Sequence, residues 1–86
     1  MQYVNLRFHY DNLAKHNISP LEVEQCFADP QRLLRAAADV YRLVGKTYSG
    51  RLLQIIYRKQ DGDVYFVFHA MSASFTERRQ YKNRGK

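Results

Sequence analysis

The segment from residue 51 to residue 71 decides the fold and reads RLLQIIYRKQDGDVYFVFHAM. Its first part, 51–59, is a nearly continuous apolar run, which predicts a strand buried on both faces. Asp61-Gly62 follows, a pair that is typical of tight hairpin turns. In the second part, 63–71, alternate side chains point to opposite faces of a strand: Val64, Phe66 and Phe68 to one face, and Tyr65, Val67 and His69 to the other. The segment therefore predicts an antiparallel β-hairpin.

Two more strands are predicted immediately before this hairpin. Residues 40–48 form the first, and Ser49-Gly50 is a turn signal that connects it to the run at residue 51. Residues 32–37, which read RLLRAA, give a weaker signal for a further short strand. This part of the chain is therefore expected to form an antiparallel meander of three strands and an optional fourth.

The first 30 residues predict one strand and two helices. Residues 3–9 largely alternate apolar and polar side chains, as a half-buried strand does. Asp11 is a suitable N-cap for a short helix that runs to His16, and Asn17 tolerates the left-handed conformation that often ends a helix. Residues 19–22, which read SPLE, have the pattern of a capping box with proline at the first helical position.

The helix that follows Ser19 has one apolar face. Val23, Cys26 and Phe27 have the spacing of neighbours on a helix surface, and Asp29-Pro30 ends the helix. Because Cys26 lies on this apolar face, its position favours a small core residue over a nucleophile.

The C-terminal segment predicts a third helix. Residues 74–77, which read SFTE, form a second capping box, and residues 78–84 are polar, with Phe75 and Tyr81 as anchors and Gly85 at the end. The chain is therefore expected to be one α+β domain, residues 1–86, with the element order β-α-α-β-β-β-(β)-α. We expect a small antiparallel sheet with the helices packed on one face.

Length and composition exclude several classes of protein. At 86 residues and 10.2 kDa, the chain has room for one domain only. A single cysteine excludes an internal disulfide, and no apolar run is long enough to cross a membrane. Residues 1–10 lack the apolar region of a signal peptide. We therefore expect a cytoplasmic protein with no membrane attachment.

The positive charge is concentrated in one half of the chain. Fourteen lysine and arginine residues against eight acidic residues give a net charge of +6. Residues 1–39 hold four basic and five acidic groups, for a net charge of −1, whereas residues 40–86 hold ten basic and three acidic groups, for +7. A basic half of this kind favours a polyanion or an acidic protein as partner, although a basic surface without a ligand has the same composition.

The residue types that carry chemistry favour metal-free work on phosphate. The three histidines lack the spacing of metal ligands, and there is no glycine-rich phosphate loop, so we expect neither a metal nor another cofactor. Cleavage of RNA through its own 2′-hydroxyl needs a base, an acid and cations. Suitable types are His16, His69, Lys15, Arg51, Arg78, Arg79, Tyr81 and Lys82. Each of these is also common as an ordinary helix-end, sheet or surface residue.

Several short motifs occur in the order found in one family of bacterial proteins. Residues 12–19, NLAKHNIS, resemble the N-L-x-K-H-G-I-S stretch of BrnT-type toxins. Arg42 and Gly45, which are spaced R-x-x-G, resemble the R-x-x-x-G segment of that family with one residue fewer between them, and residues 50–53 resemble its G-R-x-L segment. Residues 77–81 resemble its C-terminal E-R-R-x-Y.

This resemblance covers residues 8–82 apart from a poor match at 31–41, and it implies a function. BrnT-type toxins have a RelE-like fold and are metal-independent endoribonucleases that arrest translation. For this chain, the hypothesis makes His16 or His69 the acid or base. Arg51 and Arg78 are further catalytic candidates, and the candidates for holding RNA are Lys15, Arg79, Tyr81 and Lys82.

The resemblance also implies partners. A toxin of this type belongs to a type II toxin–antitoxin pair, and its cognate antitoxin carries a ribbon–helix–helix that binds DNA. The complex of the two proteins would repress its own operon. The resemblance is also compatible with a homodimer of the free toxin.

One departure from the family pattern bears on activity. The last strand of the family usually ends in A-R-x-A, whereas residues 70–73 read AMSA, so Met71 stands at the arginine position. A thioether carries no charge and cannot donate to a phosphate in a transition state. Two hypotheses follow. In one, Arg51 or Arg78 compensates in an active endoribonuclease; in the other, the chain is a weakened or inactive BrnT-like module that binds RNA or a partner protein without cleavage.

Overall fold

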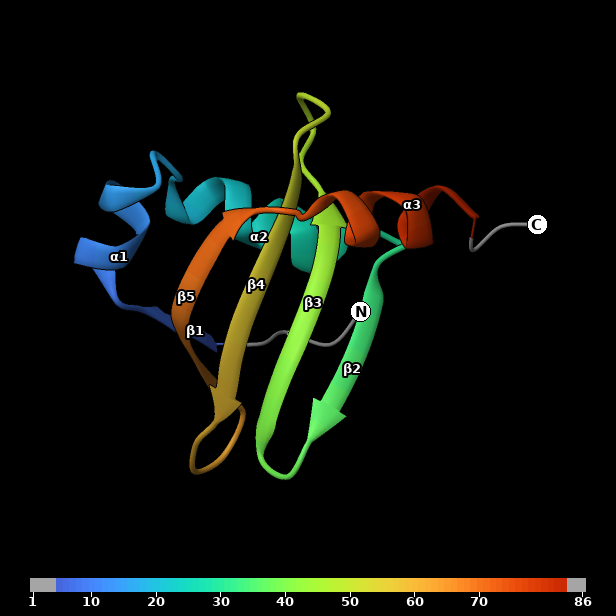
Figure 1. Cartoon of the computed structure of the whole chain (residues 1–86). Coiled ribbons are helices and arrows are strands. Elements are labelled where there is room, and N and C mark those ends of the chain that lie inside the picture. The colour runs from blue at the N-terminus through green and yellow to red at the C-terminus, as the bar shows by residue number, and fades with distance from the viewer. Residues whose placement is uncertain (1–4, 84–86) are drawn as a thin grey trace.

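The computed structural model describes residues 5–83, which form five strands and three helices in the expected order (Figure 1). The α+β class is confirmed, and the weak signal at 32–37 corresponds to a strand. The elements are β1 (Asn5–Phe8), α1 (Tyr10–Lys15), α2 (Pro20–Ala28), β2 (Leu33–Ala37), β3 (Val40–Lys46), β4 (Leu52–Lys59), β5 (Val64–Ser72) and α3 (Phe75–Asn83). The start of the expected first strand, at Tyr3 and Val4, and the expected helix end at Gly85 lie outside the described residues.

The sheet has the strand order β1-β5-β4-β3-β2. Strands β2 to β5 form the expected antiparallel meander. The expectation of an entirely antiparallel sheet is wrong for β1, which pairs with β5 in parallel, with Asn5 beside Val64 and Phe8 beside Val67. The two strands are not joined by a hairpin. A long connection through both helices and three strands returns the chain to this edge, and such a connection permits parallel pairing.

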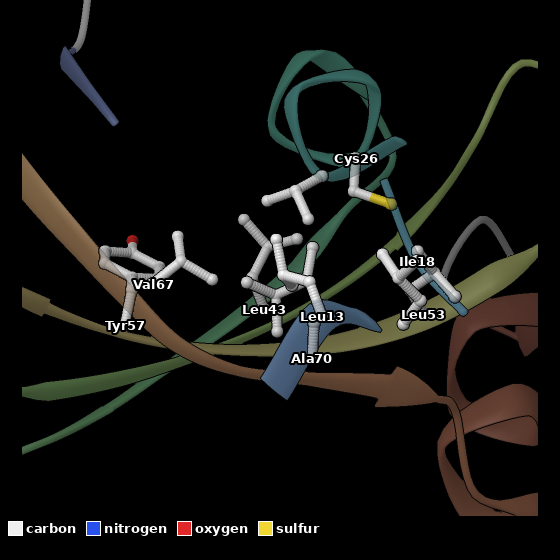
Figure 2. Close-up of a cluster of buried hydrophobic side chains, with 10 residues drawn as sticks. Leu13, Ile18, Cys26, Leu43, Leu53, Tyr57, Val67 and Ala70 are labelled. Atoms are coloured by element: carbon white, nitrogen blue, oxygen red, sulfur yellow. The ribbon is translucent and has the colours of Figure 1, made fainter. Parts of the chain in front are cut away.

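One face of the sheet is covered by α1 and α2, and we call it the helix-covered face. Figure 2 shows Leu13 of α1 and Cys26 of α2 directed toward side chains of the sheet such as Leu43, Leu53 and Val67. These residues are at most 2% exposed. Burial raises the pKa of the Cys26 thiol to about 12, so the expected role of this residue as a small core side chain is confirmed.

Helix α3 packs on the opposite face, so the expectation that all helices lie on one face is wrong. The consecutive residues Leu43 and Val44 belong to two different apolar clusters, and so do Leu52 and Leu53. Because neighbouring side chains of a strand point to opposite faces, the second cluster lies behind the first, where it contacts Tyr81 of α3. Since β4 is apolar on both faces, each face needs its own cover.

The helix ends follow local rules, with one correction. The N-cap of α1 is His9, whose Nδ1 accepts a hydrogen bond from the Asn12 amide at 3.2 Å, and not the predicted Asp11, which lies in the first turn. Asn17 has a φ of 55°, so the predicted left-handed residue is confirmed. The reciprocal bonds of both predicted capping boxes are present, one at Ser19 and the other at Ser74.

Helix α2 approaches β3 closely at Gly45. A Cβ atom at this position would lie 2.8 Å from the carbonyl oxygen of Cys26, a distance shorter than Cβ atoms in proteins adopt. Glycine is therefore needed here for packing.

Among residues 5–83, no helix is long and apolar enough to span a bilayer.

Candidate functional site

The structure brings two of the predicted site residues together, His16 at the end of α1 and His69 on β5. Their ring centroids are 5.6 Å apart, and the rings meet edge to face at 76°. Both side chains are partly exposed, and Lys15, which precedes His16, is exposed. The pair therefore presents two imidazoles and an ammonium group at one edge of the sheet.

A bulge in β5 sets the position of His69. Tyr57 pairs with Val67 and the preceding Ile56 pairs with His69, so Phe68 is an extra residue in the ladder. A bulge of this kind bends a strand and re-aims the side chains beside it. Because His69 is paired with Ile56, it lies on the face opposite Val67, and the prediction that His69 shares a face with Tyr65 and Val67 is wrong.

Strand β1 ends opposite Val67, so the C-terminal part of β5, after Val67, has no neighbouring strand on this edge. Helix α1 fills this place, and the Asn12 side chain accepts a hydrogen bond from the Ala70 amide at 3.0 Å. This bond attaches the helix to the strand and places His16 beside His69.

Asn12 also fixes the protonation pattern of the His69 ring. The Ala70 amide can only donate, so it must face Asn12 Oδ1, and this leaves Asn12 Nδ2 to donate to His69 Nδ1 at 3.4 Å. In the neutral ring the hydrogen is therefore on Nε2. Burial, together with the positive charges of His16 and Lys15, lowers the pKa of His69 below its ordinary value of 6.5.

Arg51 contacts Asn17, the residue after His16, and its guanidinium is engaged. Its Nη1 donates to Glu22 Oε2 at 2.9 Å and to the carbonyl of Asn17 at 3.1 Å. The hydrogen bond from the Ser19 amide is the main cause that lowers the pKa of Glu22, and the contact with Arg51 adds to it. Arg51 thus joins the start of β4 to the turn that follows His16.

The remaining cations among the predicted site residues lie on α3. Arg78 is exposed, and its Nε donates to the carbonyl of Ala73, just beyond the strand end that carries Met71. The guanidinium of Arg79 lies 5.9 Å from the centre of the Phe75 ring, and Lys82 is exposed. Met71 is 37% exposed.

Tyr81 is buried, which argues against its predicted role in holding RNA. It is 7% exposed, and its hydroxyl donates to Asp29 Oδ2 at 2.6 Å. Burial alone would raise the pKa of Asp29, but the bonds from Tyr81 and from two backbone amides outweigh it and lower the pKa. Tyr81 therefore anchors α3 to the end of α2.

The overall shape resembles one known toxin. No protein-family model and no curated protein matches the sequence. A crystal structure of the Brucella abortus ribonuclease toxin BrnT matches with a TM-score of 0.64 and 16% sequence identity, over 84% of this chain and 99% of that chain. This chain has a BrnT-like fold. At this identity the likeness establishes the fold alone.

Within this BrnT-like fold, six of the eight predicted site residues form two groups, while Arg51 and Tyr81 are engaged elsewhere. His16, His69 and Lys15 gather around α1 and β5, whereas the cations of α3 form a separate set. Sequence reasoning missed Asn12, because its importance depends on a strand edge that is far away in the chain. It also missed the cap at His9. Among residues 5–83, no three His, Cys, Asp or Glu side chains gather in a way that could hold a metal ion.

Proposed function

We propose that this protein is a metal-independent endoribonuclease and the toxin of a type II toxin–antitoxin pair. The observation that carries the proposal is the edge-to-face pair of His16 and His69 beside Lys15, in a fold like that of a ribonuclease toxin. Two adjacent imidazoles are the groups that an acid and a base acting on one phosphate require.

In the proposed reaction, His16 takes the proton of the 2′-hydroxyl of RNA as that oxygen attacks the phosphorus. His69 gives a proton from Nε2 to the leaving 5′-oxygen. The products are a 2′,3′-cyclic phosphate and a free 5′-hydroxyl. Lys15 supplies a positive charge for the phosphate in the transition state.

The contact with Asn12 makes Nε2 the reacting nitrogen of His69. As the acid, the ring is also protonated on Nδ1, so the Asn12 amide must turn away from Nδ1 in that form. Asn12 occupies the Nδ1 side of the ring, so Nε2 is the nitrogen that faces away from the protein support. A lowered pKa makes the protonated ring a stronger acid, but it also reduces the fraction that is protonated near neutrality. Cleavage by this route therefore falls as the pH rises through the lowered pKa of His69.

The test is cleavage of a labelled single-stranded RNA by the purified protein, in EDTA, with His16→Ala, His69→Ala and His9→Asn variants. His9 is the matched control, because asparagine also serves as an N-cap and the side chain lies outside the pair. We expect cyclic-phosphate ends from the wild type and the control, and at least a 100-fold loss of rate in the other two variants. Full activity in both would refute the proposal, and so would loss of activity in EDTA.

A second candidate function is a BrnT-like module that binds without cleavage. Met71 favours it, because this exposed position at the end of β5 lacks the arginine of the family pattern. Met71→Arg is the discriminating variant. Cleavage that appears or rises on substitution identifies a weakened wild type, whereas an equal rate in both proteins shows that this position is not needed.

We propose that the partner in the cell is an antitoxin with a ribbon–helix–helix, and that the pair acts in the cytoplasm. The sequence resemblance and the BrnT-like fold support this proposal. A neighbouring open reading frame for such a protein, and co-purification of the two products, would support the pairing. Growth that continues during strong expression of the folded chain alone would contradict a toxin.

A further inference from the structure

Helix α3 covers only one end of its face of the sheet. The part of this face that α3 leaves uncovered exposes, among the described residues, cations around a partly exposed apolar patch. We call this uncovered part the arginine face. It is formed by Arg7, Arg35, Arg42, Arg58, Ile56, Phe66 and Phe68. None of these residues belongs to the histidine pair, and only Phe68, the bulge residue before His69, contributes to its support.

The strand register aligns these side chains in rows across the sheet. In one row Arg35 pairs with Arg42, and Arg42 pairs with Ile56. In the next row Arg58 pairs with Phe66, and Phe66 with Arg7. Together the rows extend from β2 to β1, which is four strand spacings or roughly 19 Å. The arginines therefore lie along a track that is long enough for several nucleotides.

The positive charge on this track is poorly compensated within the described residues. Arg35 and Arg42 are direct cross-strand partners, and like charges in such a pair destabilise a sheet. Arg42 has Glu77 at 3.9 Å, but this buried carboxylate also accepts hydrogen bonds from Ser74 and Gln54.

The other acidic contact on this face is also weak. Arg58 has Asp39 at 4.0 Å, and both side chains are more than half exposed, so solvent screens the pair. The positive charge of the arginine face is therefore available to an external anion.

The aromatic residues of this face offer flat surfaces among the cations. The rings of Phe66 and Phe68 lie 6.3 Å apart at 30°, and the Arg58 guanidinium is 5.7 Å from the centre of Phe68. Both rings are partly exposed on an inner strand of the sheet. Aromatic side chains on a sheet face are a known platform on which unpaired bases stack, and arginines beside them hold the backbone.

The arginine face also connects two regions of the molecule. At one side, Arg35 and Arg79 line an open cleft of about 500 Å³ between β2 and α3. At the other side, Phe68 is the extra residue of the bulge and is followed directly by His69. A strand of RNA on this face would thus arrive at the histidine pair.

We propose that single-stranded RNA binds across the arginine face. Its phosphates contact Arg35, Arg42 and Arg58, and its bases stack on Phe66 and Phe68. The delivery of a phosphate to His69 rests on the proposed endoribonuclease function, whereas the binding itself does not. The combination of flat rings and cations spaced across the sheet favours RNA over an acidic protein.

The test is binding of a labelled, fully 2′-O-methylated single-stranded RNA, which cannot be cleaved through its 2′-oxygen. The paired variant Arg42→Gln/Arg58→Gln should lower the affinity at least tenfold and reduce the salt slope by about two. Phe66→Leu/Phe68→Leu keeps apolar bulk and should lower the affinity about tenfold without changing the salt slope. Lys59→Gln is the matched control, because this exposed cation pairs with Tyr65 outside the arginine face.

Unchanged RNA affinity in both paired variants would overturn the inference. Loss of a co-purified acidic protein from Arg42→Gln/Arg58→Gln, with unchanged RNA affinity, would also overturn it and assign the face to a protein. The proposed function fails separately. In that case the wild type binds the RNA through this face but yields no cleavage of an unmodified oligonucleotide.

Discussion

The two faces of the sheet are made by the same strands but differ in almost every property. The helix-covered face carries Leu43, Leu53 and Ile55, which are at most 1% exposed. The arginine face carries exposed arginines such as Arg42 and Arg58. Strand alternation separates the two sets, so that one face supplies the core and the other is free to bind.

This difference teaches how a chain of 86 residues combines stability with a large binding surface. A small domain buries a limited fraction of its surface, and the apolar side chains of one face supply most of the stabilisation. The arginine face contributes the like-charge pair of Arg35 and Arg42 and few favourable contacts, so we expect its value to the protein to lie in its ligand. Substitutions on the two faces should therefore have opposite signatures in stability and RNA binding.

The largest effect is expected on the helix-covered face. Leu53→Ala removes a side chain that is 0% exposed and leaves a cavity under α1 and α2, so it should lower the free energy of unfolding by about 2–5 kcal/mol. Urea unfolding followed by circular dichroism measures this loss. If Ile56→Ala, on the arginine face, costs as much, the contrast between the faces is wrong.

A smaller loss is expected where α2 meets β3. Gly45→Ala puts a methyl group 2.8 Å from the backbone oxygen of Cys26, which has little freedom to move, so we expect about 1–3 kcal/mol of destabilisation. The same urea experiment measures it. RNA affinity under native conditions should be unchanged, because the arginine face is on the other side of the sheet. A stable Gly45→Ala protein would show that α2 packs more loosely than described.

The hydrogen bond from Tyr81 to Asp29, which anchors α3, should stabilise the fold in a pH-dependent way. Tyr81→Phe removes a 2.6 Å hydrogen bond to the Asp29 carboxylate and should cost about 1–2 kcal/mol at pH 7. The folded-state pKa of Asp29 is lowered from 3.8, so this stabilisation is present above the usual pKa and is lost as the pH falls through the lowered one. Unfolding curves of the two proteins should converge at acid pH. A difference that is constant with pH would contradict this role of the carboxylate.

Local sequence signals predicted several elements of the fold correctly. The hairpin signal at Asp61-Gly62, the apolar run of β4 and the capping boxes at Ser19 and Ser74 are local rules, and the structure follows them. The same rules could not show that β1 joins β5 in parallel, because pairing across a long connection depends on the whole chain.

The site was less predictable than the fold. His16 and His69 were candidates by residue type, but their contact depends on a bulge at Phe68 and on the bond from Ala70 to Asn12. The sequence pattern treated Arg51 as a free cation, whereas its pairing with Glu22 depends on tertiary packing. The arginine face was not recognised because its residues are spread over five strands.

The smallest effect on stability is expected on the arginine face itself. Arg35→Gln removes one member of a like-charge pair with Arg42, so the free energy of unfolding should stay within about 0.5 kcal/mol of the wild type. The same substitution should weaken RNA binding. Destabilisation by more than 1 kcal/mol would mean that this arginine has a structural role.

Two adjacent isoleucines report directly on the two faces. Ile55 is 0% exposed on the helix-covered face, Ile56 is partly exposed on the arginine face, and Ile18 lies in the core under the helices. The measurement is a titration of protein with ¹³C-labelled isoleucine methyl groups by 2′-O-methylated single-stranded RNA, followed by NMR. We expect the Ile56 signal to shift in proportion to binding while Ile55 and Ile18 stay nearly still. Shifts of Ile55 and Ile18 with a silent Ile56 would contradict the assignment of RNA to the arginine face.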